Sequence, residues 1–189
     1  RLVSVEYRHL VAIAYEVTVL DHTAPLVVSS QLVNHQDAQA EDGPAHRDDP
    51  RLAKTFGHRV LHAAVEETRD HRLLLGYRTA HSGMTLGVGV DHVIDTAMPH
   101  RTDVRVDPDH SEVVVTADAQ PGVPLTITKY AAYQRSRNVA ARELVARCDR
   151  TLDRAVRDGF EHQLEVQRDH LQRFWARADI EVEASEETP

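Results

Sequence analysis

The hydrophobic period of this chain changes near residue 130, and this change limits the possible folds more than any other feature. Over roughly the first 130 residues, short runs of apolar residues alternate with polar ones, the pattern of strands that bury one face. From Lys129 to Val182, apolar residues instead recur every three or four positions, which keeps them on one face of a helix. The sequence therefore predicts a β-domain that ends in two amphipathic helices.

The first expected helix lies between residues 138 and 159. Asn138 is expected to cap its start, because an Asn side chain accepts a hydrogen bond from a free backbone N–H. Gly159 fits the left-handed conformation that often ends a helix. The apolar face consists of Ala141, Leu144, Val145, Cys148, Leu152, Ala155 and Val156.

The second expected helix follows directly and is roughly 27 Å long at ~1.5 Å per residue. Its apolar stripe, which Gln167 interrupts, consists of Phe160, Leu164, Leu171, Phe174, Trp175 and Ala178. Two interpretations remain open: the helices cover a sheet, or they connect the β-domain to a part of the protein that this sequence lacks. The polar residues 184–189 are typical of a linker.

Residues 1–34 are expected to form three strands, because β-branched residues alternate with other residues between turn-forming ones. In the first of them, residues 1–10, successive side chains would face opposite sides throughout. Six further strands are expected between residues 59 and 134, with turns at 107–111 and 120–124. This number of short strands predicts a large antiparallel sandwich, and Tyr15, Tyr130 and Phe160 are expected in its core.

The segment 35–51 has no hydrophobic period, and it contains five carboxylates, two arginines and two prolines. Because it is long for a connection between strands, we expect a mobile surface loop or a lid over a site.

Composition excludes two classes of partner. The formal net charge is −8 and only two lysines occur, whereas a nucleic-acid-binding face needs clustered Lys and Arg. No run approaches the ~20 apolar residues of a membrane span. The chain begins with Arg1, so we expect a fragment or a processed product. Its single cysteine, Cys148, cannot form an internal disulfide and is expected to be a core thiol.

The thirteen histidines do not have the spacing of a metal site. His58 and His62 would share one strand face without further ligands. Asp91, His92 and Asp95 resemble a catalytic group, but on a strand Asp91 and His92 point to opposite faces. Asp91 and Asp95 would lie roughly 13 Å apart, too far for a pair of glycosidase carboxylates.

Other candidates also lack the required context. Gly83, Gly87 and Gly89 begin no helix, so they form no phosphate-binding loop and instead indicate a bulge or close packing. His81 and Ser82 lie in a turn without a nucleophile elbow. Consecutive Glu66 and Glu67 alternate faces. We therefore expect no catalytic, cofactor-binding or metal-binding residue in this chain.

Several stretches resemble the N-terminal region of glycoside hydrolase family 65, which includes maltose, kojibiose, nigerose and trehalose phosphorylases and some trehalose hydrolases. The most specific are RHLVAIAYEVT at 8–18, KYAAYQRSR at 129–137 and FWARADIEVE at 174–183. The resemblance implies an antiparallel β-supersandwich of the galactose mutarotase type over residues 1–135, with its first strands missing. Residues 136–189 would form a helical linker to an (α/α)6 catalytic barrel beyond Pro189.

The same resemblance implies a non-catalytic domain of a cytoplasmic enzyme that cleaves α-glucosides such as maltose, kojibiose or trehalose. The missing barrel would hold the general-acid glutamate and the phosphate site, so this chain alone would be inactive. Inorganic phosphate would be a co-substrate of a phosphorylase, and no cofactor is implied. The domain would pack against the barrel, shape one side of the substrate entrance and support a homodimer, with Phe174 and Trp175 in the exposed barrel-facing surface.

Two alternatives remain. The first is a free-standing carbohydrate-binding or interaction module, although the chain has only nine Tyr, Phe and Trp residues to contact sugar rings. The second is an epimerase of the mutarotase type, which would need a convergent His and Glu pair that the sequence does not place.

Overall fold

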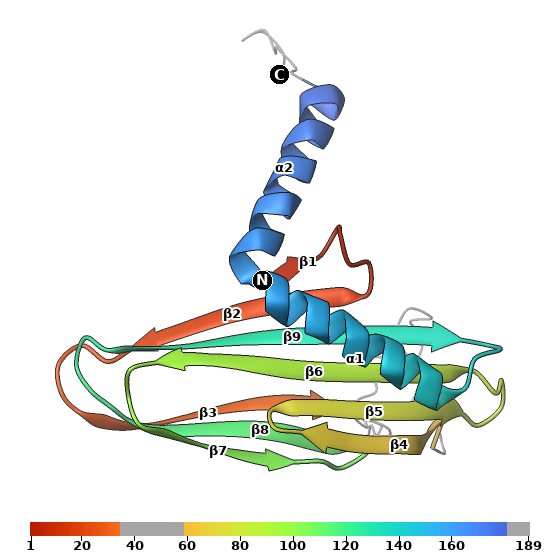
Figure 1. The fold of residues 1–189 in the computed structure, drawn as a ribbon, viewed down its shortest axis with the longest axis horizontal. Coiled ribbons are helices and arrows are strands. Elements are labelled where there is room, and N and C mark those ends of the chain that lie inside the picture. Colours follow the sequence, from red (N-terminus) through yellow and green to blue (C-terminus); the bar gives the residue numbers. More distant parts are fainter. Residues whose placement is uncertain (35–58, 181–189) are drawn as a thin grey trace, which may run out of the picture.

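The computed structural model describes residues 1–34 and 59–180, which form two antiparallel sheets and two helices (Figure 1). The first sheet, sheet A, has the strand order β1-β2-β9-β6-β5-β4, and the second, sheet B, has the order β3-β8-β7. The elements are β1 (Leu2–Val3), β2 (Leu10–Thr18), β3 (Ala24–Val33), β4 (Leu61–Arg69), β5 (Arg72–Thr79), β6 (Thr85–Thr96), β7 (His100–Arg105), β8 (His110–Ala119), β9 (Pro124–Ser136), α1 (Ala141–Asp158) and α2 (Phe160–Ala178). The predicted mainly-β fold with two C-terminal helices is confirmed.

Three layers result, because sheet A is covered on both faces. Helix α1 crosses one face of sheet A, and sheet B packs on the other (Figure 1). Side chains alternate between the two faces along each strand. In β6, for example, Gly87 and Gly89 face α1, whereas the buried His92 and the half-buried Ile94 face sheet B.

In the layer between α1 and sheet A, the helix lies directly against the backbone of β6. A Cβ atom on Gly87 would lie 2.6 Å from the carbonyl carbon of Leu144, and one on Gly89 would lie 2.8 Å from Cδ1 of Leu152. At Gly87, where the new atom would meet the helix backbone, only glycine allows α1 to approach β6 this closely. The predicted apolar face of α1 is confirmed, with Leu152 fully buried among Cys148 and other core residues.

The layer between the sheets is a second apolar cluster. It is built around the buried residues Met98, Val115, Ala119, Leu125 and Ile127. On β3 the side chains are alternately half-buried and exposed along the whole strand, which is the pattern of a strand with one face on a core.

Two local predictions were wrong. The first strand ends after Val3, and the chain then turns: the Ser4 N–H donates to the Leu10 carbonyl at 3.0 Å, and the Leu10 N–H donates to the Tyr7 carbonyl at 2.9 Å. The side chain of Tyr7 is thereby freed from the sheet and donates to Asp158 at the end of α1 at 2.5 Å.

The start of α1 was the second error, because the helix begins after Ala140 with no side-chain cap, and Asn138 lies outside it. The Thr85 hydroxyl donates to the carbonyls of Ser136 and Val139, at 3.1 and 2.6 Å. These bonds hold the connection against β6. The helix ends at Gly159 as predicted, and the Gly159 N–H donates to the Ala155 carbonyl. Its φ of 81° is positive, but its ψ of 166° lies outside the predicted left-handed conformation.

The predicted division into residues 1–135 and 136–189 stays a prediction, as does the supposed loop or lid at 35–51, which lies outside the described residues. Neither described helix is both long and apolar enough to cross a membrane.

Candidate functional site

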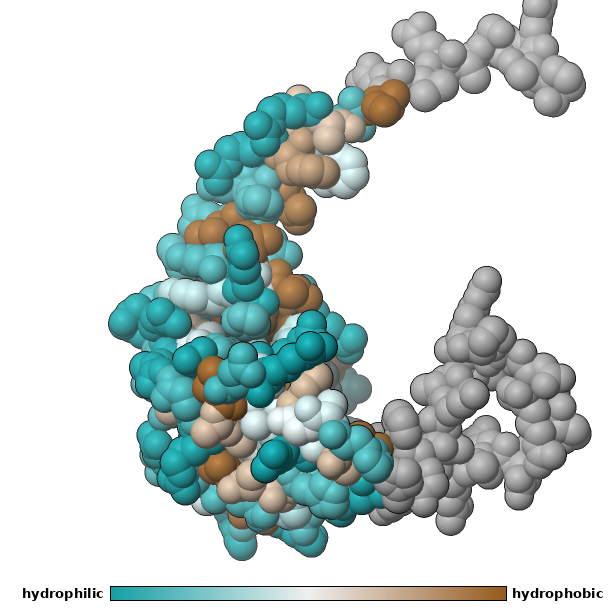
Figure 2. Space-filling model, turned by 90° about the vertical axis from the view of Figure 1, so that its right-hand side faces the viewer, coloured by the Kyte–Doolittle hydropathy of each residue, from teal (hydrophilic) through white to brown (hydrophobic). Residues whose placement is uncertain are grey.

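Helix α2 carries an apolar stripe that the sandwich does not cover. The helix leaves the sandwich beyond Gly159 and projects away from both sheets (Figure 1). Leu171, Phe174 and Trp175 are 42%, 46% and 55% exposed, and the two aromatic rings meet edge to face with centroids 5.1 Å apart. Apolar side chains gather along one side of this projecting part (Figure 2). The predicted exposure of Phe174 and Trp175 is thus observed.

A hollow of about 470 Å³ lies between α2 and the start of the chain. It is lined by Arg1, Leu2, Leu164, Gln167, Arg168, Leu171, Gln172 and Trp175. The Oε1 atom of Gln167 is buried and has no hydrogen-bond partner among the described residues. Gln163 lies one turn earlier and is buried, and its Nε2 donates to the Ala155 carbonyl at 3.2 Å, which anchors the base of α2 to α1.

An ion-pair cluster ties α1 to sheet A. The Arg72 guanidinium on β5 donates to Asp91 on β6 at 2.7 Å and to Asp149 and Asp153 on α1 at 2.5 and 2.6 Å. Burial alone would lower the pKa of Arg72, but the hydrogen bonds to these carboxylates outweigh it and raise the pKa. Asp91, which the sequence analysis rejected as a catalytic residue, is part of this ion-pair cluster.

A polar pair lies between the two sheets. Nε2 of His92 lies 2.6 Å from the Ser30 hydroxyl on β3, and Nδ1 lies 3.0 Å from the His71 carbonyl. If Nδ1 carries the proton and donates to that carbonyl, then Nε2 accepts from Ser30. Burial lowers the pKa of His92 and outweighs the raising effect of the His71 hydrogen bond, which favours the neutral ring. Asp91 and His92 point to opposite faces, as predicted.

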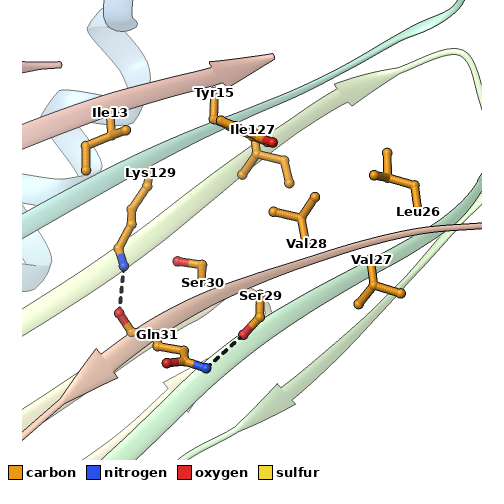
Figure 3. Close-up of a pocket in the computed structure, with 10 residues that line it drawn as sticks. All are labelled: Ile13, Tyr15, Leu26, Val27, Val28, Ser29, Ser30, Gln31, Ile127 and Lys129. Carbon is orange, nitrogen blue, oxygen red and sulfur yellow. Dashed lines mark hydrogen bonds between the residues drawn. The ribbon is translucent and has the colours of Figure 1, made fainter. Parts of the chain in front are cut away.

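A groove of about 460 Å³ opens where sheet B ends beneath sheet A (Figure 3). Its lining consists of Ile13, Tyr15, Leu26, Val27, Val28, Ser29, Ser30, Gln31, Ile127 and Lys129. Tyr15, predicted to be a core residue, is 50% exposed here because no strand of sheet B lies beneath it. Tyr130 is buried and Phe160 packs half-buried against the core, as predicted.

The remaining candidates from the sequence do not converge. Cys148 is a buried core thiol, as predicted, and burial raises its pKa to about 12. In the described part of the chain, no group of three or more His, Cys, Asp or Glu side chains could hold a metal ion. Of the histidine pair, His62 is exposed on β4 and His58 lies outside the described residues. Ser82 bonds to Thr79 within its own turn.

Sequence reasoning missed both the Arg72 cluster and the His92–Ser30 pair. The spacing of Asp149 and Asp153 places them on one helix face, which is a weak signal for a shared cation. The pair between the sheets has no sequence signal, because its members are 62 positions apart.

Comparison with known proteins identifies the family. The sequence model of the glycosyl hydrolase family 65 N-terminal domain matches residues 1–174. The chain is 33% identical over 190 aligned positions to an uncharacterised glycosyl hydrolase of Mycobacterium leprae, and 22% identical over 187 positions to the α,α-trehalose phosphorylase of Thermoanaerobacter brockii. These matches span 100% and 97% of this chain but only 23% of each relative.

A solved structure assigned as a kojibiose phosphorylase from the human microbiome has the same fold. It superposes with a TM-score of 0.65 at 11% sequence identity, covering 92% of this chain and 20% of that one. The family match extends through both sheets and α1 and ends within α2. The chain therefore belongs to glycosyl hydrolase family 65 and forms its N-terminal β-sandwich domain.

Proposed function

We propose that this chain is a non-catalytic domain that holds and positions the catalytic part of an α-glucoside phosphorylase or hydrolase. The observation that carries the proposal is the uncovered stripe of Leu171, Phe174 and Trp175 on the projecting part of α2. An amphipathic helix gains stability by burying its apolar face. A second protein surface would cover this stripe.

The hollow beside α2 supports this role. A catalytic domain packed there would bury the apolar stripe, and one of its donors would satisfy the Oε1 acceptor of Gln167, which lines the hollow; the Oε1 of Gln163 is also buried without a partner in the described chain but does not line the hollow. A buried acceptor without a partner costs about 1–3 kcal/mol, so such a bond would favour one docking geometry. This chain spans 23% of its relatives' length, which leaves room for a catalytic domain.

The proposed reaction is cleavage of an α-linked glucose disaccharide such as trehalose, kojibiose or maltose, with phosphate or water as acceptor. The names of the similar phosphorylases support this substrate class. The catalytic groups would lie in the other domain, no cofactor is needed, and the sandwich would support a homodimer.

A paired assay tests the proposal. This chain and the intact protein are each incubated with trehalose, maltose, kojibiose and nigerose, with and without phosphate. Glucose 1-phosphate from the intact protein alone would identify a phosphorylase, and phosphate-independent glucose would identify a hydrolase. Turnover by this chain itself, or no turnover by the intact protein on any α-glucoside, would contradict the proposal.

Variants of the intact protein test the docking surface. Trp175→Asp would place a charge in the buried contact and should weaken the attachment of the catalytic domain, seen as faster proteolysis between the domains. Arg173→Asp, in the same turn of α2 but on the face opposite the stripe, is exposed and is the matched control. Equal behaviour of the two variants would argue against docking through the stripe.

A further inference from the structure

Helix α2 packs against the rest of the described chain near its base and then projects away from it (Figure 1). Phe160 and Leu164 lie half-buried against the core, whereas every described residue from Arg168 onward is exposed. Gly159, which joins α1 to α2, is uncrowded: within residues 1–34 and 59–180, a Cβ atom there would have no neighbour within 4 Å. The direction of α2 therefore depends on specific contacts on either side of Gly159.

One of these contacts starts from Tyr7, whose backbone is fixed in the turn between β1 and β2. Its N–H donates to Oγ of the buried Ser4 at 2.9 Å, and its carbonyl accepts from the Leu10 N–H, also at 2.9 Å. Leu10 is fully buried at the start of β2, so the position of Tyr7 is tied to sheet A. Tyr7 is thus a fixed point of the sandwich, from which its side chain reaches α1.

The Tyr7 side chain contacts the end of α1 at two places. Its hydroxyl donates to Oδ2 of Asp158 at 2.5 Å, and the Arg154 guanidinium lies over its ring, 5.4 Å from the centroid. Asp158 is the last residue of α1 and directly precedes Gly159. A hydrogen bond to a carboxylate is roughly twice as strong as one between neutral groups, so this contact holds the end of α1 against the sandwich.

Further hydrogen bonds hold the junction between the helices. Nε of Arg157 donates to Oδ1 of Asp158 at 3.1 Å, so both carboxylate oxygens have a donor. Beyond Gly159, Gln163 donates to a carbonyl in the last turn of α1 at 3.2 Å. These two bonds join one part of the helical segment to another, whereas the bond from Tyr7 joins the junction to the sandwich.

We propose that Tyr7 is a positioning residue: by holding Asp158, it sets the direction in which α2 leaves the sandwich. The inference rests on the proposed function, in which α2 joins the sandwich to the catalytic domain, and on the expectation that the sandwich shapes one side of the substrate entrance. The same hydrogen bond would then set how this side of the entrance faces the catalytic groups.

The length of α2 makes its direction sensitive to small changes at the junction. Arg173 lies about 21 Å beyond Gly159 at ~1.5 Å per residue, so a rotation of about 10° at the junction would move it by about 4 Å. Misplacement of a substrate-positioning group by about 1 Å is enough to affect a reaction. Loss of a single hydrogen bond at the base of α2 can therefore alter substrate binding.

Distance measurements in the intact protein test the inference. Spin labels at Asp118→Cys, exposed on sheet B, and at Arg173→Cys, on the face of α2 opposite the stripe, report the direction of α2. The buried Cys148 should stay unlabelled. Tyr7→Phe removes the hydroxyl but keeps the ring, and it should shift or broaden the distance between the labels by at least about 3 Å.

Further variants separate the hydrogen bond from a general loss of packing. Asp158→Ala should give the same change as Tyr7→Phe, and the double variant no further change, because all three lack the same bond. Tyr133→Phe is the matched control, because it also removes one tyrosine hydroxyl, from a ring on β9 that is 49% exposed. It should leave the distance unchanged.

Kinetics of the intact protein, on the α-glucoside that it turns over, provide a second measurement. Because the proposed catalytic groups lie in the other domain, Tyr7→Phe should raise KM at least about threefold and leave kcat within about twofold. A loss of stability alone would lower the active fraction, and with it the apparent kcat, without changing KM.

Equal distances in all variants, or an equal change in Tyr133→Phe, would overturn the inference. A lower unfolding midpoint of Tyr7→Phe with unchanged distances and KM would also overturn it, because the contact would then only stabilise the fold. Changed distances with an unchanged KM would overturn the role in the reaction. If the intact protein turns over no α-glucoside, the proposed function fails, whereas a changed distance in both Tyr7→Phe and Asp158→Ala still supports the control of α2 by Tyr7.

Discussion

Helices α1 and α2 follow each other in the chain with similar apolar stripes, yet only one of them finds a surface to cover. On α1 the stripe is buried against β5, β6 and β9, and Leu152 is 0% exposed. On α2 only the first turns reach the core, and Leu171 is 42% exposed. Glycines beneath α1 allow its close approach to the sheet. An apolar stripe thus shows that a helix needs a partner surface, whereas its neighbours decide whether that surface is present.

The largest expected difference comes from the same substitution on both helices. Leu152→Ala in this chain should lower the free energy of unfolding by about 2–5 kcal/mol, because it leaves a cavity in the core. Leu171→Ala should cost less than ~1 kcal/mol, because its side chain is already half in water. Urea unfolding of the two variants measures both values. Similar costs would show that α2 is packed more tightly than its exposure indicates.

The next effect tests why α1 can lie so close to sheet A. Gly87→Ala should destabilise the chain by about 1–3 kcal/mol, because the new methyl group meets the backbone of α1, which cannot move without the whole helix. Gly89→Ala is the matched control, since its methyl group meets the ends of the Leu152 and Leu74 side chains, which can shift. The midpoint of thermal unfolding should be lower for Gly87→Ala than for Gly89→Ala. The reverse order would contradict the contact between Gly87 and the helix backbone.

Packing on the opposite face of sheet A should make the stability of the chain depend on pH. His92 has a lowered pKa in the folded chain, so around and below pH 6.5 the unfolded chain binds more protons at this residue. Stability should be fully present above that pH and fall as the pH drops from 6.5 toward the folded pKa, by at most about 1.4 kcal/mol per pH unit. His71, Asp91 and Lys129 also act on this ring and are unchanged in the control variant His92→Gln. Urea midpoints at pH 7.5 and 5.5 should differ more for the unaltered chain than for the variant.

The smallest effect is expected at the exposed end of α2. Trp175→Ala in this chain should cost less than ~1 kcal/mol, because the ring is 55% exposed and meets the Phe174 ring only edge to face. A buried aromatic residue would cost about 3–5 kcal/mol. The midpoint of urea unfolding decides between the two. In the intact protein the cost should be larger, and an equally small cost there would argue that nothing covers the stripe.

Much of the fold could be predicted because its signals are local. The spacing of apolar residues gave the strands and both helices, and Gly159 gave the break between them. The prediction that Asn138 caps α1 failed because the connection into α1 is held by Thr85, a residue more than fifty positions earlier. The prediction that Tyr15 is a core residue failed because its strand alternates like a buried strand, although sheet B ends before reaching Tyr15.

Of the two partly uncovered surfaces, the stripe on α2 could be predicted and the groove at β3 could not. Exposure of Phe174 and Trp175 followed from a family resemblance that places another domain beyond α2. The groove at β3 could not be foreseen, because it depends on which strands pair. Sheet order is set by contacts between residues far apart in the chain, such as β2 with β9.

Local sequence patterns are enough to show where strands give way to helices and which side of each element is apolar, because these properties depend on neighbours a few residues away. Long-range packing, by contrast, buries α1 while α2 projects, brings His92 to Ser30 and leaves β3 as an edge of sheet B within the described residues. These outcomes depend on long-range packing, in which the shape of one surface selects what can lie against it.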